Sequence, residues 1–226
     1  MPLKVLFVTA TSAEAEPLKK VRGIVTGSSG YSATNLDISV LVTGIGSVPT
    51  AWNLMHWIEL HGKPDLAINA GIAGSFTDEL SPGDVVIPVS DCFADSGIEN
   101  GEEFQNLYET GLADPDEFPF VNGILPADKV FVKKFRKMLK GVPGITSGIA
   151  TGTEATRQKI IKKYNPGIET MEGASFFYIC IRERIPFFGL RAISNRIETR
   201  NRDNWKIQLA LDNLAVKLDE VFIKLE

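Results

Sequence analysis

Two short stretches in the second half of the chain carry side chains suited to chemistry on a small polar ligand. Met171-Glu172-Gly173-Ala174 fits a strand-to-helix turn, whose glycine permits a tight bend and leaves the Glu172 carboxylate facing a ligand. The apolar run 187–192 predicts a buried strand that delivers Ser194 and Asn195 into the same crevice. The two stretches together predict a polar binding site.

A third candidate lies near the start of the chain. Glu14 follows the first predicted strand, where a carboxylate could take a proton from water. For these residues taken alone a structural explanation is favoured, because Glu14 and Glu16 at the start of a helix would interact favourably with its dipole. In the same way Glu172 could cap a helix, and Asn195 could close a turn.

Glycine turns after two predicted strands place backbone amides near these positions. Gly44-Ile45-Gly46 precedes one helix, and Gly71-Ile72-Ala73-Gly74 follows another strand. Amides near a helix N-terminus suit an anion, a polarised water or a sugar hydroxyl, although such glycines often mark only a tight turn. Neither turn has the ending of a P-loop or the spacing of a dinucleotide fingerprint, so nucleoside triphosphates and NAD are poor candidates.

Strand-like and helix-like segments alternate along the chain, which predicts an α/β fold. Between 91 and 126 the pattern fails, and the mixture of aromatics, glycines and acids predicts a long loop, either a lid or subunit contact or a surface excursion. The predicted strands are 4–9, 38–43, 66–70, 85–89, 145–150 and 186–192, and the predicted helices are 13–21, 48–61, 128–139, 154–164, 173–184 and 205–225.

Composition excludes several classes of protein. With 44% apolar residues, 23% charged residues and a formal net charge of -4, the chain resembles an ordinary globular protein without a basic field for nucleic acid. No stretch is long enough to span a membrane. Cys92 and Cys180 suggest neither disulfide nor zinc, and His56 and His61 are wrongly spaced for a metal pair. We expect one domain, 1–226, in the cytoplasm, with no metal and no cofactor.

Several motifs in the same order resemble the purine nucleoside phosphorylase and nucleosidase superfamily over nearly the whole chain. The resemblance implies a single-domain nucleoside phosphorylase-like fold, with a central mixed β-sheet flanked by helices, and a nucleoside as ligand. Within it, the likeness is greatest to the futalosine hydrolase family. The motifs are Ala10-Thr11-Ser12-Ala13-Glu14, Thr43-Gly44-Ile45-Gly46, Asn69-Ala70-Gly71-Ile72-Ala73-Gly74, Pro82-Gly83-Asp84, Met171-Glu172 and Ser194-Asn195, followed by Arg200, Arg202 and Trp205.

The resemblance implies roles for the candidate residues. Glu172 and Met171 would bind the ribose, and Asn195 would hold the purine. Ser194 would fix the turn of Asn195 or bond the base, and Glu14 would activate water. The turns at Gly46, Ile72 and Gly74 would complete the ligand site, and Arg202 could pair with a substrate carboxylate. No aromatic marks the base-stacking position; Phe104 or Phe177 could substitute.

Two departures from better-known relatives indicate the reaction. The methylthioadenosine/S-adenosylhomocysteine nucleosidases carry an aspartate where Asn195 stands, and an amide favours a 6-oxo purine over adenine. The phosphorylases hold phosphate with arginines. The corresponding stretches here contain no arginine, which favours hydrolysis; they are Thr9-Ala10-Thr11, Gly44-Ile45-Gly46-Ser47 and Asn69-Ala70-Gly71. Three hypotheses remain: a futalosine hydrolase, another nucleosidase or phosphorylase, and a noncatalytic nucleoside-binding protein. The aromatic loop also predicts a homo-oligomer.

Overall fold

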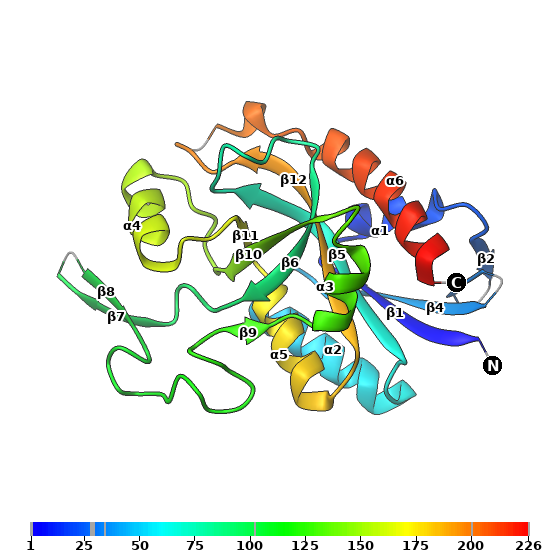
Figure 1. Ribbon diagram of the computed structural model, residues 1–226, viewed down its shortest axis with the longest axis horizontal. Coiled ribbons are helices and arrows are strands. Elements are labelled where there is room, and N and C mark those ends of the chain that lie inside the picture. The colour runs from blue at the N-terminus through cyan, green and yellow to red at the C-terminus, as the bar shows by residue number, and fades with distance from the viewer. Residues whose placement is uncertain (1, 28–29, 34, 102, 200, 226) are drawn as a thin grey trace.

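The computed structural model describes residues 2–27, 30–33, 35–101, 103–199 and 201–225, with the side chains of 25–27, 30–33 and 202 left aside. A mixed sheet at the centre has the strand order β11-β10-β6-β12-β5-β1-β4-β3-β2 (Figure 1). The strands are β1 (Leu3–Thr9), β2 (Val25–Gly27), β3 (Gly30–Ala33), β4 (Leu36–Val42), β5 (Leu66–Ser75), β6 (Val85–Asp91), β10 (Lys140–Thr146), β11 (Ile168–Thr170) and β12 (Phe187–Arg196), with β9 (Leu125–Pro126) beside β6.

One part of the sheet closes on itself. Strand β11 pairs in parallel with β10 and also antiparallel with the end of β5, where Glu169 faces Gly74. Strand β12 runs parallel to β5, and Asn195 is also in register with Gly74. The closure therefore brings the ends of β5, β11 and β12 to one edge of the sheet, although they are far apart in sequence.

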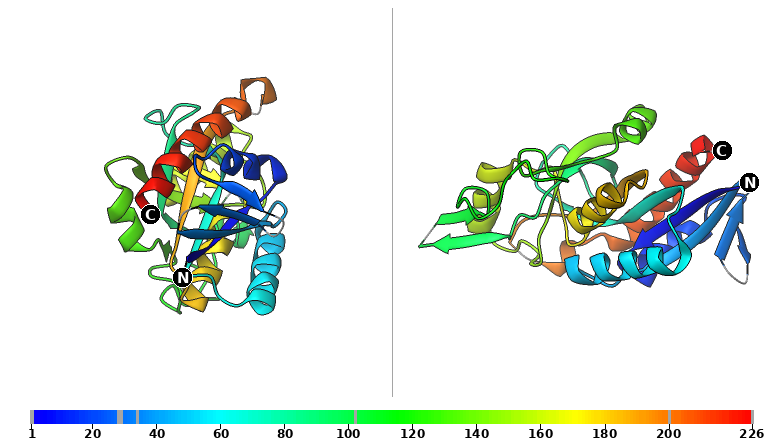
Figure 2. Two further views of the ribbon diagram at one scale, coloured as in Figure 1. Left: turned by 90° about the vertical axis from the view of Figure 1, so that its right-hand side faces the viewer. Right: turned by 90° about the horizontal axis from the view of Figure 1, so that it is seen from below.

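Helices cover the two faces of the sheet (Figure 2). α2 (Ser47–His61) packs against α5 (Gly173–Glu183) on one face, and α1 (Ser12–Lys19) packs against α6 (Ile207–Leu225) on the other. Alternate residues of β1 serve the two layers, because Phe7 joins the cluster with α6 and Val8 joins the cluster with α5. The remaining helices are α3 (Lys129–Phe135), α4 (Glu154–Tyr164) and the short η1 (Arg202–Asn204).

The predicted α/β fold is confirmed, and the main errors concern short or irregular elements. The fifth strand was predicted at 145–150 and lies at 140–146, because Gly141 and Pro143 weaken the strand signal of a segment that tertiary pairing nevertheless makes extended. The helix predicted at 128–139 ends at Phe135. The other predicted helices begin or end within two residues of their observed bounds.

The segment 91–126 is not a structureless loop. It contains the hairpin of β7 (Gly97–Asn100) and β8 (Glu103–Asn106), which projects at the left of Figure 1 beyond α4. Phe120 packs between Tyr108 and Tyr178, which ties the segment to α5. Among the described residues, no helix is long and apolar enough to cross a membrane.

Candidate active site

The candidate residues meet where the parallel strands β1, β5 and β12 end, and β11, which is antiparallel to β5, brings Glu172 to the same place. Glu14 lies in α1 just after β1, Glu172 lies between β11 and α5, and Asn195 lies near the end of β12. Carboxyl ends of parallel strands are the usual position for ligands in α/β folds. The structure thus brings together three side chains that are up to 181 positions apart in the sequence (195 − 14).

Glu14 has two roles, one for each carboxylate oxygen. Oε2 accepts hydrogen bonds from the Thr11 amide (3.0 Å) and hydroxyl (2.9 Å), which completes a capping box at the start of α1. Oε1 accepts from the Ile72 amide in β5 at 3.0 Å. Gly71 is required beside it, because a Cβ there would lie 2.5 Å from Oε1. The capping explanation is therefore correct for one oxygen and incomplete for the other.

Glu172 occupies the N-cap position of α5, but its side chain does not cap that helix. Its Oε1 instead accepts from the amide of Gly46, at 2.9 Å, across from the start of α2. Burial raises the pKa of the Glu172 carboxyl, while the Gly46 amide and the charge of Arg191 oppose the rise. The capping alternative for Glu172 is wrong, and the carboxylate is held toward the site.

The backbone amides of Gly46 and Ile72 do not have the ligand-binding role that the sequence predicted. Both were expected to face a ligand, and each donates to a site carboxylate instead. Gly46 has a φ of 100°, a conformation that residues with a side chain rarely adopt. Ile72 is part of β5, which continues through Ser75, so the turn predicted at 71–74 is wrong. The Gly46 turn and the β5 amide therefore orient the carboxylates, and the ligand would meet the carboxylates themselves.

Arg191 was missed by the sequence interpretation. Its guanidinium is buried in β12 and donates to the backbone oxygens of Asn69 (2.7 Å) and Leu190 (2.9 Å) and to the side-chain oxygen of Asn69. Burial lowers its pKa, while the charges of Glu172, Glu14 and Asp91 raise it. An arginine inside an otherwise apolar strand was the available signal, because a buried cation requires partners of opposite charge.

Asn195 and its neighbours form a second part of the candidate site. The Ser194 hydroxyl donates to Asn195 Oδ1 at 2.7 Å, and Asn195 Nδ2 donates to the Arg196 oxygen at 3.0 Å. A bulge after Ile193 turns this part of β12. Asn195 thus lies in a strand and does not close a turn, whereas the predicted role of Ser194 in fixing Asn195 agrees with the geometry.

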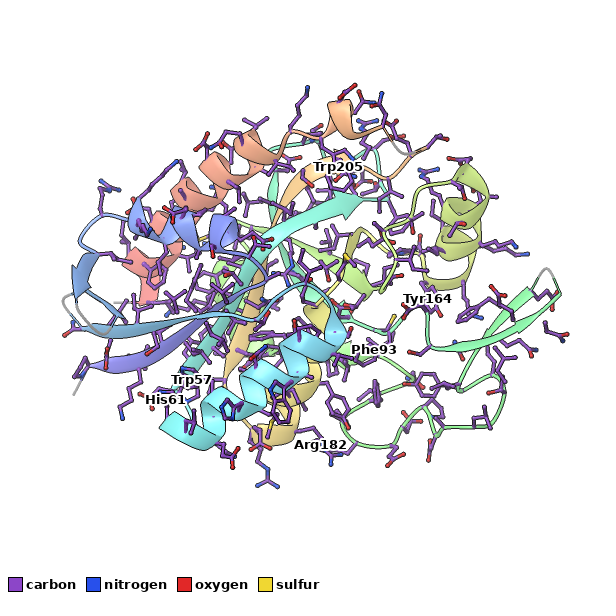
Figure 3. The ribbon with its side chains drawn as sticks, turned by 180° about the vertical axis from the view of Figure 1, so that it is seen from behind. Trp57, His61, Phe93, Tyr164, Arg182 and Trp205 are labelled. Carbon is purple, nitrogen blue, oxygen red and sulfur yellow. The ribbon has the colours of Figure 1, made fainter. Side chains whose placement is uncertain are left out.

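A loop and a later segment border Asn195. A small hollow there is lined by Ala150, Thr151, Asn195 and Trp205, among others, and Figure 3 labels Trp205 at this end of the sheet. Glu169 of β11 holds the loop, because its carboxylate accepts from the amide (2.9 Å) and the hydroxyl (2.5 Å) of Thr151.

Other predicted residues are placed less favourably. Gly74 lies beneath Asn195, and a Cβ there would meet Ile197 at 2.8 Å and Asn195 Nδ2 at 3.4 Å. Phe177 is buried in the core against Phe187, so it is unavailable for stacking on a base. Phe104 lies in the hairpin strand β8, beside Lys163. The side chain of Arg202 and all of Arg200 lie outside the described residues.

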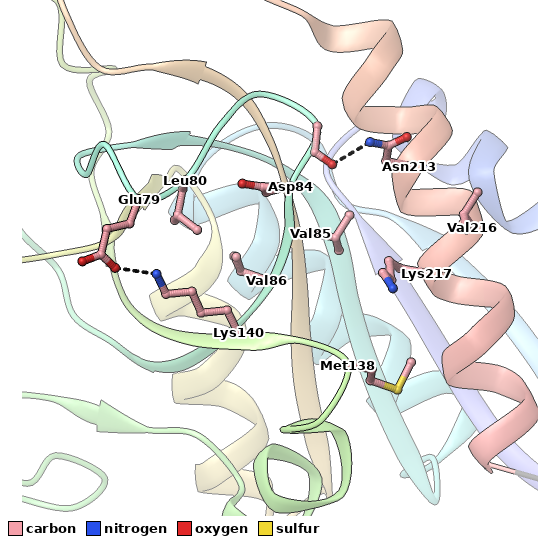
Figure 4. A pocket seen from close by; sticks show the side chains of 11 residues that line it. Glu79, Leu80, Asp84, Val85, Val86, Met138, Lys140, Asn213, Val216 and Lys217 are labelled. Atoms are coloured by element: carbon pink, nitrogen blue, oxygen red, sulfur yellow. Dashed lines mark hydrogen bonds and ion pairs between the residues drawn. The ribbon is translucent and has the colours of Figure 1, made fainter.

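A cavity of about 480 Å³ lies elsewhere among the described residues. It lies between β6 and α6, and Figure 4 shows Lys140 paired with Glu79 at one side and Asn213 bonded to the backbone at the other. None of the predicted site residues lines it. We place the site at the strand ends because the converging carboxylates and amide are there. The described residues contain no cluster of three or more side chains suited to a metal ion.

Comparison with known proteins agrees with this geometry. A model of the phosphorylase superfamily matches residues 4–223. The chain belongs to this superfamily. A 5'-methylthioadenosine/S-adenosylhomocysteine nucleosidase of Buchnera aphidicola is 31% identical over 175 residues, covering 75% of this chain and 72% of the relative. A futalosine hydrolase of Streptomyces coelicolor is also 31% identical, over 161 residues, covering 69% of this chain and 65% of the relative.

Solved structures support the fold. Futalosine hydrolase of Helicobacter pylori superposes with a TM-score of 0.81 at 15% identity, covering 98% of both chains. An aspartate-to-asparagine mutant of the H. pylori 5'-methylthioadenosine/S-adenosylhomocysteine nucleosidase, with 5'-methylthioadenosine in its active site, superposes at 0.82 with 16% identity, covering 99% of this chain and 100% of the other. The predicted superfamily and fold are confirmed, and so is the enzyme class, because the relatives at 31% identity are nucleosidases, which are N-glycosyl hydrolases.

Proposed function

We propose that the protein hydrolyses the N-ribosidic bond of futalosine and releases hypoxanthine and dehypoxanthine futalosine, a step in menaquinone synthesis. The observation that carries this proposal is the amide of Asn195, which Ser194 holds at the edge of the sheet where Glu14 and Glu172 converge. Relatives named futalosine hydrolase, at 31% and 26% identity, support it.

The hydrogen bonds of Asn195 leave the amide suited to a 6-oxo purine. Oδ1 uses one lone pair for Ser194, and Nδ2 uses one hydrogen for Arg196. One lone pair and one N–H remain. The lone pair would accept from a protonated N7, and the N–H would donate to O6, which is the pattern of departing hypoxanthine. Adenine presents a 6-amino donor, which would oppose the remaining N–H.

The ribose side suits attack by water. In the transition state positive charge develops on the sugar, and the carboxylate of Glu172 would accept from the ribose hydroxyls and stabilise that charge. Glu14 would take the proton of the attacking water. A phosphate dianion would be repelled by the two carboxylates. The guanidinium of Arg191, which lies near them, already donates to Asn69 and would not be available to bind phosphate.

Product analysis tests the proposal. Purified protein is incubated with futalosine, inosine and 5'-methylthioadenosine, each with and without phosphate, and released bases are identified. Hypoxanthine from futalosine at a rate independent of phosphate is expected. Phosphate-dependent release would instead indicate a phosphorylase, and binding of nucleosides without any turnover would indicate the noncatalytic alternative.

A methylthioadenosine/S-adenosylhomocysteine nucleosidase is the second candidate, since the Buchnera relative is as similar as the futalosine hydrolase. Glu14 and Glu172 would serve either substrate equally. The H. pylori mutant with an introduced asparagine still contains methylthioadenosine, so binding alone cannot discriminate. Turnover decides: faster release of adenine than of hypoxanthine would favour this candidate.

A homo-oligomer is also proposed, because apolar side chains are exposed beside the site. Val48 is 79% exposed and Trp52 69%, on the helix that starts at the turn holding Glu172. A second copy of the chain would cover them. Light scattering should give at least a dimer for the wild type and a smaller species for Trp52→Glu; a monomeric wild type would contradict this.

The role of Arg202 in binding a substrate carboxylate remains a proposal from the sequence. Arg202→Ala should raise the KM for futalosine while leaving the KM for inosine unchanged, because inosine lacks the carboxylate. Equal effects on both nucleosides would contradict it.

A further inference from the structure

Asp91, at the end of β6, is a buried carboxylate that none of the roles above uses. It is 1% exposed and lies below the turn that carries Glu172. Its Oδ2 faces the backbone of Gly173, where a Cβ would be only 2.2 Å away, and its Oδ1 accepts from the Cys92 amide at 2.8 Å. Gly173 is therefore required by the approach of this carboxylate as well as by the bend of the turn.

Two threonine hydroxyls connect Asp91 to the start of α5. The Thr146 hydroxyl donates to Asp91 Oδ1 (2.9 Å) and accepts from the Ala174 amide (2.7 Å). The Thr170 hydroxyl lies 3.3 Å from that of Thr146 and accepts from the Gly173 amide at 3.1 Å. A hydroxyl has one hydrogen. Because Thr146 gives its hydrogen to Asp91, Thr170 must be the donor to Thr146.

The chain of hydrogen bonds therefore ends at Asp91, and every donor in it points toward this carboxylate. The amide of Gly173 donates to Thr170, Thr170 donates to Thr146, and Thr146 donates to the carboxylate. Without that acceptor, the Thr146 hydroxyl would turn toward another partner and its contact with the Ala174 amide would weaken. The two amides fixed in this way directly follow Glu172.

Charged groups around Asp91 belong to the same site. Arg191 of β12 and Glu172 before α5 both interact with it electrostatically, whereas β10 and β11 present the neutral Thr146 and Thr170. Burial, foremost, raises the pKa of Asp91 to about 7, with Thr146, Arg191 and the Cys92 amide opposing the rise. The carboxylate is thus coupled to the ribose side by geometry and by charge.

We propose that Asp91 is a positioning residue, which ends the hydroxyl chain and so holds the turn 171–174 with Glu172 directed at the ribose. The proposal rests on the proposed nucleosidase function. It assigns no contact between Asp91 and the substrate. Its effect on turnover should therefore pass through Glu172.

A double-mutant cycle tests this coupling. Asp91→Ala alone should lower kcat by about 10²-fold, the effect of misplacing a catalytic group. In the Glu172→Gln background the same substitution should change kcat by no more than about 3-fold, because the carboxylate that it positions is gone. If the fold-reduction of kcat in the double variant equals the product of the two single reductions, the proposal is overturned, because Asp91 would then act independently of Glu172.

Conservative variants separate positioning from folding. Asp91→Asn keeps an oxygen for Thr146 and should restore most of the kcat lost in Asp91→Ala, with a changed pH profile of kcat. Thr146→Val should reproduce the loss. Asp84→Asn is the matched control, because Asp84 also accepts a backbone amide, that of Ser81, but at the opposite end of β6. A kcat for Asp91→Asn as low as for Asp91→Ala would contradict positioning through the hydrogen bond.

A structural measurement keeps the two proposals distinguishable. If the wild type cleaves no nucleoside, the proposed function fails, and crystal structures of Asp91→Ala and the wild type still test the positioning. Loss of the contact between Glu172 and the Gly46 amide in the variant would support it. An unchanged turn in a folded variant would overturn it, whatever the substrate.

Discussion

The two parts of the site that we propose to bind the ribose (the ribose side) and the purine (the base side) are built differently. On the ribose side, Glu14 and Glu172 are each held by a backbone amide from a segment more than fifty residues away, with the buried cation Arg191 nearby. On the base side, Asn195 is held by its own sequence neighbours Ser194 and Arg196.

This difference separates the chemistry from the choice of substrate. Moving the carboxylates would require shifting β5 or the starts of α1, α2 and α5, which are parts of the packed fold. Changing the base side requires one side chain or the loop held by Glu169. The relatives at 31% identity are named for two different nucleosidase activities.

The largest expected effect comes from the ribose side. Glu14→Gln should lower kcat by about 10² to 10⁴-fold, because the amide cannot take the proton of water. Glu16→Gln is the matched control: Glu16 is exposed, paired with Lys19 in the same helix, and should leave kcat unchanged. Steady-state rates of base release measure both. Equal rates for Glu14→Gln and wild type would remove Glu14 from the mechanism.

Stability should depend on pH through Asp91. Its pKa is raised from 3.8 to about 7, so the folded state holds a proton that the unfolded chain has lost between these values. The contribution of Asp91 to the free energy of unfolding is fully present below pH 3.8 and is lost as the pH rises through 7. At 1.36 kcal/mol per pKa unit, the loss is at most about 4 kcal/mol.

Urea denaturation at pH 5, 6, 7 and 8 measures this slope. The free energy of unfolding of Asp91→Asn should change less with pH than that of the wild type, because the amide does not titrate. Parallel curves for the two proteins would show that another group controls the dependence.

Sequence reasoning predicted the place of a candidate residue in the fold correctly where a short motif determines the local structure. Glu172 stands two residues after β11, at the turn before α5, and Asn195 stands near the end of the apolar strand β12, so the local pattern was sufficient to place them. It failed for Arg191 and Asp91, whose importance depends on partners from other strands. Without a known register, no pattern shows that Asp91 lies below Gly173.

The smaller expected effect concerns the loop on the base side. Thr151→Val removes the hydroxyl that donates to the buried Glu169 while keeping the amide contact. A lost hydrogen bond of about 1 kcal/mol should raise the KM about 5-fold with little change in kcat. A fall in kcat at unchanged KM would show that this loop acts on the chemical step and would weaken the separation between the two sides.

The central claim is that Asn195 selects the base, and a matched pair of substrates tests it most directly. Futalosine and its 6-amino analogue differ only at position 6 of the purine, so the 5' group cannot influence the ratio of their kcat/KM values. The wild type should prefer the 6-oxo compound by at least about 10²-fold, and Asn195→Asp should reverse or abolish that preference while retaining the fold. A wild type that cleaves the 6-amino compound equally well, or a ratio unchanged in Asn195→Asp, would contradict the account.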